Sequence, residues 1–139
     1  MQTDGEQTLS LVLFSGTDDR LSAAAILAAG AAVMGGRVNV FLQFWALGAF
    51  RTSSIRTSHG VAAEADAEEK ALFRLAEEKG PHWSDVFRQA KEIGEVKFHA
   101  CAKSMEMYGI TMNDLDPLVD DVEGVAAFTA DATGPITFI

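Results

Sequence analysis

Cys101, the only cysteine, is the residue with the greatest potential for chemistry in this chain. It lies in the segment VKFHACAKSMEMYG, residues 96–109, where an apolar run predicted to form a strand gives way to a predicted helix. Backbone N–H groups at a helix start lack partners within the helix, and together with the helix dipole they favour a thiolate over a thiol. Lys103 falls in the first turn and supports this effect, whereas Glu106 opposes it weakly. The pattern is typical of a reactive thiol.

An alternative interpretation of Cys101 is a small apolar residue of the core. Unpaired cysteine is among the most buried residue types, and the local pattern by itself favours burial over reactivity. His99 stands two positions earlier and shares a strand face with Cys101, so its imidazole is a candidate acceptor for the thiol proton. A buried histidine bonded to the backbone explains the same residue equally well. The local sequence leaves both roles open.

The composition limits the class of protein. One cysteine excludes a disulfide and a resolving cysteine within the chain, which fits a reducing compartment, so we expect a cytoplasmic protein. The net charge of −9 opposes nucleic-acid binding, because phosphate contacts need a concentrated basic surface. The N-terminus, MQTDGEQTLS, lacks the basic region of a secretory signal. We expect one domain over residues 1–139, frayed over residues 1–8.

Apolar runs over residues 23–34 and 40–50 are shorter than the about 20 residues of a membrane-spanning helix, so we expect a soluble protein without a transmembrane segment.

Strands and helices alternate in the predicted order, which indicates an α/β fold with a largely parallel sheet. The predicted strands cover residues 9–14, 38–44, 96–100, 124–128 and 136–139. The predicted helices cover residues 20–34, 64–79, 84–93, 102–108 and 111–119. The first helix is apolar nearly all round, so it buries more than one side or meets another subunit.

The carboxyl ends of parallel strands share one edge of the sheet, where open α/β folds bind ligands. Gly16, Thr17 and Asp18 follow the first predicted strand, Trp45 follows the second and Cys101 follows the third. We therefore predict a pocket at this edge. Further candidates for its lining or for helping the thiol are His99, Lys103 and Ser104.

The polar loop RTSSIRTSHG, residues 51–60, leaves from the same edge, and its Arg51, Arg56 and His59 are candidates for holding an anionic sulfur donor. For each of the three, a solvated loop residue is the more ordinary interpretation. No G-x-x-x-x-G-K, G-x-G-x-x-G or C-x-x-C motif occurs, so nucleotide binding and dithiol chemistry have no support. A single His-x-Cys pair supplies too few metal ligands. We expect no metal and no cofactor.

The run ACAKSMEMYGI, residues 100–110, resembles the cysteine segment of the DsrE/DsrF/DsrH-like family of small sulfur-handling proteins. One branch of that family has the pattern A-C-x-x-S-M-x-x-x-G-I. Residues 9–47 are similar to the family's opening strand, its helix of small residues and its second strand ending in Phe-Trp. VEGVAAF to ITFI is similar to its closing region. The resemblance implies a three-layer α/β/α domain with a mostly parallel sheet of about five strands.

The resemblance also implies a function. It assigns a chemical role to Cys101 alone, as the carrier of sulfur in persulfide form between proteins. Because the chain has no second cysteine, the persulfide must pass to a partner's thiol, with sulfurtransferase-like activity. The implied partners are sulfur donor and acceptor proteins, and the implied assembly is a homo-oligomer, a trimer or larger. Two alternatives stay open: a non-catalytic oligomeric module that binds a small ligand, and a one-cysteine peroxidase that forms a sulfenic acid at Cys101.

Overall fold

The computed structural model describes residues 8–139. Its strands are β1 (Thr8–Leu13), β2 (Arg37–Leu42), β3 (Val96–Cys101), β4 (Asp121–Glu123) and β5 (Ile136–Phe138). Its helices are α1 (Asp18–Val33), α2 (Phe44–Ala49), α3 (Ala67–Lys79), α4 (Trp83–Ile93), α5 (Ala102–Tyr108) and α6 (Val125–Asp131). A short 3-10 helix covers Met112–Asp114. Of the stretch predicted to be frayed, residues 1–7 lie outside the described residues and Thr8 begins β1.

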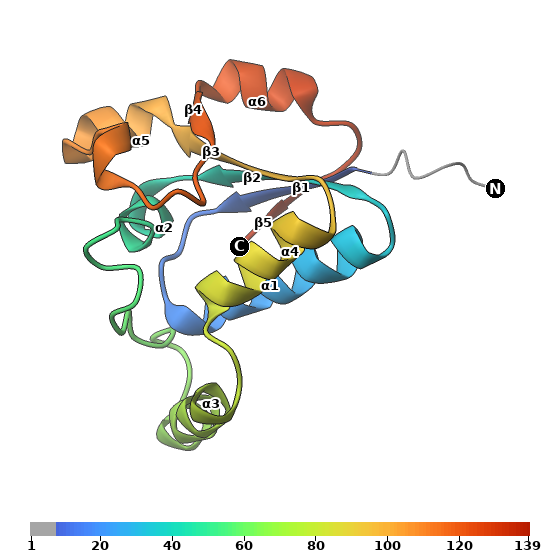
Figure 1. The fold of residues 1–139 in the computed structure, drawn as a ribbon. Coiled ribbons are helices and arrows are strands. Elements are labelled where there is room, and N and C mark those ends of the chain that lie inside the picture. Colours follow the sequence, from blue (N-terminus) through green and yellow to red (C-terminus); the bar gives the residue numbers. More distant parts are fainter. Residues whose placement is uncertain (1–7) are drawn as a thin grey trace.

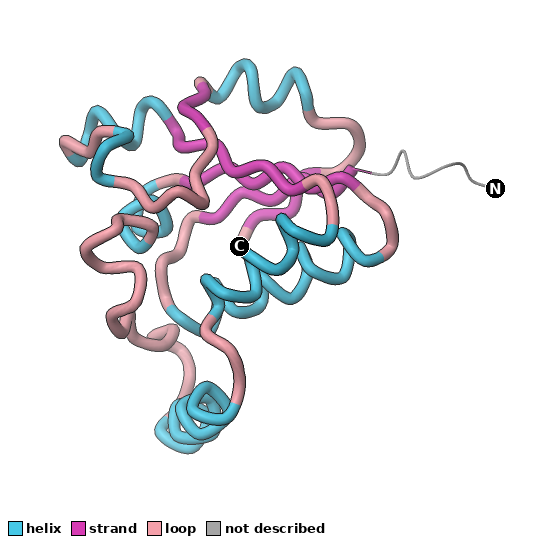
Figure 2. The backbone as a smooth tube through the Cα atoms, in the orientation of Figure 1, coloured by secondary structure: helices cyan, strands magenta, loops and turns pink. Residues whose placement is uncertain are grey.

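The five strands form one sheet in the order β4-β3-β2-β1-β5, and every neighbouring pair is parallel. Helices α1 and α4 cover one face, and α6 lies over the other (Figure 1). Helices α2 and α5 pack together at the carboxyl ends of the strands (Figure 1). This arrangement confirms the predicted three-layer α/β/α fold, and Figure 2 shows the strands passing between the helical layers.

The two sheet faces bury different amounts of apolar surface. Leu11 of β1, Val40 of β2 and Phe98 of β3 are fully buried and form the main core with α1 and α4. The alanines of α1 let it approach the sheet and α4 closely, because they add little width. The opposite face carries only a small apolar cluster, which Phe128 of α6 completes. Each fully buried Leu, Val or Phe stabilises the fold by about 1.5–3 kcal/mol, so the α1 and α4 side supplies most of the stability.

Two predicted elements near the C-terminus were wrong. The helix predicted over residues 111–119 is a single 3-10 turn, because Pro117 lacks an N–H and disfavours helical backbone at Asp116. The segment predicted as a strand, residues 124–128, forms α6 instead, and the fourth strand precedes it as β4. A short apolar run such as GVAAF does not separate strand from helix by its pattern.

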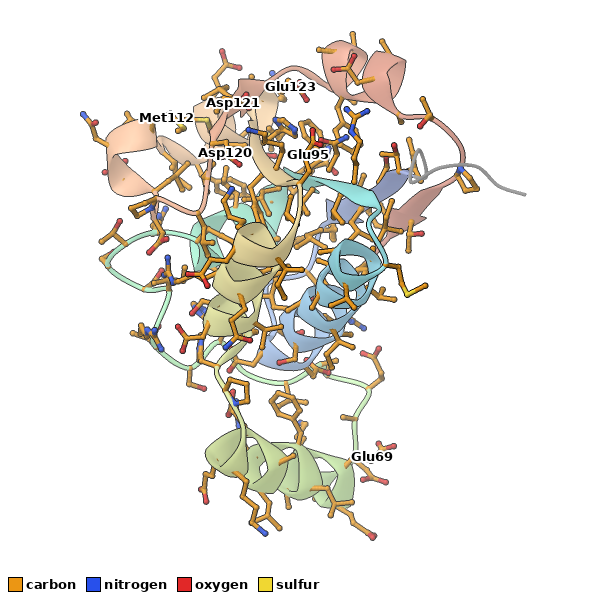
Figure 3. The ribbon with its side chains drawn as sticks, turned by 45° about the vertical axis from the view of Figure 1, so that its right-hand side comes forward. Glu69, Glu95, Met112, Asp120, Asp121 and Glu123 are labelled. Atoms are coloured by element: carbon orange, nitrogen blue, oxygen red, sulfur yellow. The ribbon has the colours of Figure 1, made fainter. Side chains whose placement is uncertain are left out.

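Helix α3 stands away from the sheet (Figures 1 and 3), and no residue of it is buried by the part of the chain that the structure describes. A capping box starts it: Asp66 accepts a hydrogen bond from Glu69 N at 2.8 Å, and Glu69 accepts one from Asp66 N at 2.9 Å. Arg74 ties the helix to the body through Asp18 at 3.0 Å. Within residues 8–139, no helix has both the length and the apolar character needed to cross a membrane.

Candidate functional site

Cys101 lies at the junction of β3 and α5, where the chain turns from the sheet into a helix. Its Sγ accepts a hydrogen bond from Ser104 N at 3.4 Å, so the side chain caps the helix. The residue is only 3% exposed. It packs in the small apolar cluster with Val12, Phe41 and Phe128, and the two phenyl rings stack with centroids 4.6 Å apart. The thiol is therefore held at a helix start but enclosed by apolar side chains.

Ser104, whose N–H donates to Cys101, is buried and joins two elements. Its Oγ accepts a hydrogen bond from Phe44 N at 3.1 Å, which links α5 to the first residue of α2. Phe44 has a φ of 46°, a conformation that bulky residues rarely adopt. Lys103, in contrast, is exposed and pairs with Glu106 at 3.2 Å. The structure thus places Ser104 against the sulfur and Lys103 in solvent.

His99 shares the sheet face of Cys101, but both of its ring nitrogens have other neighbours. Nδ1 lies 2.6 Å from Asp121 Oδ1, and Nε2 lies 3.3 Å from Asn39 Oδ1. Asp121 belongs to β4, which the sequence did not place here. The imidazole is therefore positioned by an aspartate and an asparagine.

Glu123 is a neighbour of the thiol that the sequence did not indicate. It stands opposite Cys101 in the parallel register of β3 and β4, and Figure 3 shows it on β4 beside Asp121. Its Oε1 is buried and has no hydrogen-bond partner among the described residues, and it lies 3.8 Å from His99 Nδ1. Glu123 therefore brings a second carboxylate of β4, besides that of Asp121, close to the imidazole of His99. Register across strands is invisible in a sequence, which explains the omission.

A second feature of the carboxyl edge is a pocket of about 410 Å³, which we call the edge pocket. Three of its residues, Gly16, Thr17 and Trp45, are among those predicted to gather here. Cys101 lies apart from this pocket, since its sulfur faces the cluster under α6. The residues lining the edge pocket are Phe14, Ser15, Gly16, Thr17, Arg20, Trp45 and His59.

Asp18 lies outside the edge pocket and is 1% exposed. Its carboxylate accepts hydrogen bonds from Trp83 Nε1 at 3.1 Å, Arg74 at 3.0 Å and His59 N at 3.0 Å. The hydrogen bonds from Arg74 to Glu77 and Asp18 raise the pKa of its guanidinium. Asp18 therefore ties α1 to α3, α4 and the loop before α3, which is a structural role.

The basic residues of the loop over residues 51–60 separate in space. Arg56 pairs with Asp85, with one nitrogen 3.0 Å from the carboxylate. Arg51 lines a different cavity, of about 470 Å³, together with Asp114. Only His59 reaches the edge pocket.

Comparison with known proteins gives the family of this chain. The model of the DsrE/DsrF/DrsH-like family matches residues 5–79, and the described part of this match runs from β1 through α3. The chain is 29% identical over 154 aligned residues to the uncharacterized protein YrkE of Bacillus subtilis (strain 168), with 94% of each covered.

The fold is similar to the solved structure of MTH1491, a protein of unknown function from Methanobacterium thermoautotrophicum. The TM-score is 0.58 at 17% sequence identity, with 96% of this chain and 98% of the other covered. At that identity the likeness concerns the fold. The family match extends over more than half of the 139 residues, and the parallel sheet agrees with it. The chain belongs to the DsrE/DsrF/DrsH-like family.

Proposed function

We propose that this protein is a sulfur carrier with sulfurtransferase-like activity, which holds sulfane sulfur as a persulfide on Cys101 and passes it to a thiol of a partner protein. The observation that carries the proposal is the position of the sulfur at the junction of β3 and α5, where Ser104 N donates to it. An N–H donor at a helix start favours negative charge on sulfur. The family match over residues 5–79, together with the resemblance of residues 100–110 to the family's cysteine segment, supports the same role for Cys101.

The transfer is balanced without an outside oxidant or reductant. The Cys101 thiolate attacks the outer sulfur of a donor persulfide, the sulfur–sulfur bond of the donor breaks, and the donor leaves as a thiolate. The Cys101 persulfide then has the negative charge on its terminal sulfur. A partner thiolate attacks that sulfur, forms the new persulfide and releases the Cys101 thiolate. Because Cys101 is the only cysteine, an internal disulfide cannot end the sequence.

The apolar cluster over Cys101 suits a carrier, because it keeps water and oxidants from a reactive sulfur. The rings of Phe41 and Phe128 stack on each other, with centroids 4.6 Å apart, in the same cluster as the thiol. Phe128 is the buried residue of α6. Loading and release therefore require α6 to move away from the sheet. The helix is seven residues long and otherwise largely exposed, so little apolar contact opposes this motion.

The burial of Cys101 favours a second candidate function, a non-catalytic module that binds a small ligand in the edge pocket. In that case the thiol is core packing and the pocket alone is functional. The two candidates differ in one respect: the module binds its ligand equally well when Cys101 is replaced by Ser.

We further propose a homo-oligomer, a trimer or larger, that works in the reducing cytoplasm with thiol proteins as donor and acceptor. A lone free thiol is stable in such a compartment. Ile26 and Val33 of α1 and Met34, the residue that caps its C-terminus, are 67%, 65% and 83% exposed, which is unusual for three large apolar side chains so close together. Contact with a second copy would remove them from water.

Intact mass spectrometry tests the proposal. Wild type and Cys101→Ser are incubated with polysulfide, freed of donor and weighed. We expect wild type to gain the mass of one sulfur atom, reversibly on addition of a reducing thiol, and Cys101→Ser to gain nothing. Equal gain by both variants, or no gain by a wild type whose thiol also resists alkylation, contradicts the carrier and leaves the binding module.

A further inference from the structure

We propose that the edge pocket binds a small organic oxyanion. Arg20, Ser15 and Thr17 hold its charged end, and its apolar body lies against Trp45. The inference is independent of sulfur transfer, because none of these residues belongs to the cluster around Cys101.

The pocket has the size and the wall of a ligand site. About 410 Å³ falls within the roughly 300–1,000 Å³ that is typical of small-molecule sites. Trp45 is 61% exposed, and its ring meets that of Phe14 edge-on at 4.9 Å. Two aromatic rings on the wall of a hollow offer a stacking surface for an apolar or planar group.

The polar end of the pocket is built for an acceptor. One guanidinium nitrogen of Arg20 lies 3.4 Å from Ser15 Oγ, and Ser15 Oγ lies 3.2 Å from Thr17 Oγ1. Guanidinium groups pair with two oxygens of a carboxylate, sulfonate or phosphate, and both hydroxyls can rotate to donate to the same group. The ring of His59 also lines the pocket, and its Nε2 has no hydrogen-bond partner among the described residues.

The acidic residues nearby leave this end free for an anion. Asp18 is directed to Arg74 and Trp83, and both oxygens of Asp19 accept from Ala62 N, at 3.2 and 3.3 Å. Among residues 8–139 the exception is Glu64, which competes with an anion through an ion pair with Arg20. The Glu64 side chain is 71% exposed, and an exposed pair of this kind is weak. A bound oxyanion takes the place of Glu64 on the guanidinium.

The pocket is formed before any ligand arrives. A side chain at Gly16 would place its Cβ 2.4 Å from the carbonyl oxygen of Trp45, so the loop after β1 is in close contact with α2. Phe44, which precedes Trp45, is itself fixed through its N–H to Ser104. The aromatic wall and the polar end are therefore held at a constant separation, which lowers the cost of ordering them on binding.

Fluorescence titration tests the inference, because Trp45 is exposed and Trp83, the other tryptophan, is 2% exposed. The probes are phenyl phosphate and benzenesulfonate, with benzyl alcohol as the neutral analogue and inorganic phosphate as the anion without a ring. We expect saturable quenching by the two aromatic anions only, and its absence in Trp45→Phe. The proposal is overturned if benzyl alcohol binds with the same affinity as the anions. It is also overturned if neither aromatic anion shows saturable binding.

Charge variants test the role of Arg20. We expect Arg20→Gln to weaken binding of phenyl phosphate by about tenfold or more, the loss typical of a charge-assisted pair. Glu64→Gln keeps the guanidinium and removes its competitor, so it must bind more tightly than wild type. Arg37→Gln is the matched control, since Arg37 is exposed, pairs with Glu95 at 3.5 Å and lies outside the pocket. Unchanged affinity in Glu64→Gln, or an equal loss in Arg37→Gln, contradicts the assignment even if Arg20→Gln fails to fold.

Discussion

The side chain of His82 caps the N-terminus of α4: its Nδ1 accepts a hydrogen bond from Ser84 N at 3.1 Å. Burial lowers the pKa of His82, and the nearby positive charge of Arg56 lowers it further. This capping hydrogen bond needs an unprotonated Nδ1 as its acceptor. It therefore forms only when the imidazole of His82 is neutral. Histidine is not a typical capping residue, so the helix was predicted to begin only at residue 84.

The first prediction concerns this residue and pH. Because folding lowers the pKa of His82, its contribution to stability is complete above about pH 6.5 and is lost as pH falls through that value toward the lower pKa of the folded state. His82→Asn keeps a cap that does not titrate. We expect its free energy of unfolding in urea to fall less between about pH 7.5 and about pH 5.5 than that of wild type. Equal slopes in the two proteins would contradict this account of the cap.

The residues around the thiol show how far single positions were predictable. Cys101 at a strand-to-helix junction, and the shared face of His99 and Cys101, both follow from local pattern. Asp121 and Glu123, which neighbour them, come from β4 and are about twenty residues away in the chain. Only the pairing of strands brings them together, and a sequence does not state that pairing. The engagement of His99 by Asp121 therefore appears only in the structure.

At the scale of elements, α6 decides access to the thiol. It contacts the sheet through Phe128, which stacks on Phe41 and covers Cys101. The other side chains of α6 are largely exposed, as Val125 at 58% shows. A helix held by one ring opens at a small cost in free energy, whereas β3 and β2 are fixed by the main core.

The second prediction follows from this single anchor. Phe128→Ala should raise the rate at which iodoacetamide alkylates Cys101 in the folded protein by about a hundredfold, because local opening costs about 3 kcal/mol less when the ring is absent and each 1.4 kcal/mol is about tenfold. The same change should lower the free energy of unfolding by about 3 kcal/mol, as is usual for a buried phenylalanine. Val125→Ala on the same helix is the control and should leave the rate unchanged. Equal alkylation rates in Phe128→Ala and wild type would show that α6 does not limit access.

The long elements were predictable, and of the short ones α5 and β5 were predicted but α2, β4 and α6 were not. The run of small residues over α1 and the apolar strands β1 to β3 determined their types from local pattern alone. Helix α2 has six residues and follows β2 after a single residue, so its apolar sequence looked like an extension of the strand. Helix α6 has seven residues and β4 has three, and tertiary contacts with Phe41 and β3 settle their form.

At the scale of the whole molecule, the exposed apolar surface of α1 is the candidate interface for the proposed homo-oligomer. Ile26 and Met34 line a hollow of about 710 Å³ that is continuous with the exposed helix face. A monomer gains nothing from such exposure, and burial in an interface would stabilise the protein by about 25 cal/mol for each Å² removed from water.

The third prediction addresses that surface. In sedimentation velocity, wild type should form a trimer or larger species, and Met34→Glu should dissociate it, because a buried charge without a partner is costly. Leu72→Glu is the matched control: Leu72 is 60% exposed on α3, which stands away from the sheet in Figure 3, and it does not line the hollow beside Met34. A monomeric wild type at high concentration, or equal dissociation by Leu72→Glu, would contradict the proposed interface.

The three-layer architecture was predictable at this scale because strand, helix and strand followed one another closely, which requires right-handed crossovers and a parallel sheet. The separation of the Cys101 thiol from the edge pocket was not predictable from the sequence. The carboxyl ends of β1 and β3 do share an edge, but Cys101 faces α6, whereas Trp45 and Gly16 face the edge pocket. Side-chain direction at strand ends depends on turn geometry that composition does not reveal.

The central claim is that Cys101 carries sulfur from a donor to an acceptor, and a transfer assay tests it most directly. The protein is loaded with isotopically labelled sulfane sulfur, freed of donor and mixed with a thiol such as glutathione. The account predicts that one labelled sulfur for each chain leaves Cys101 and appears as the persulfide of the added thiol, whereas Cys101→Ser carries none. Label that never loads, or that stays on the protein in the presence of excess thiol, would contradict the claim.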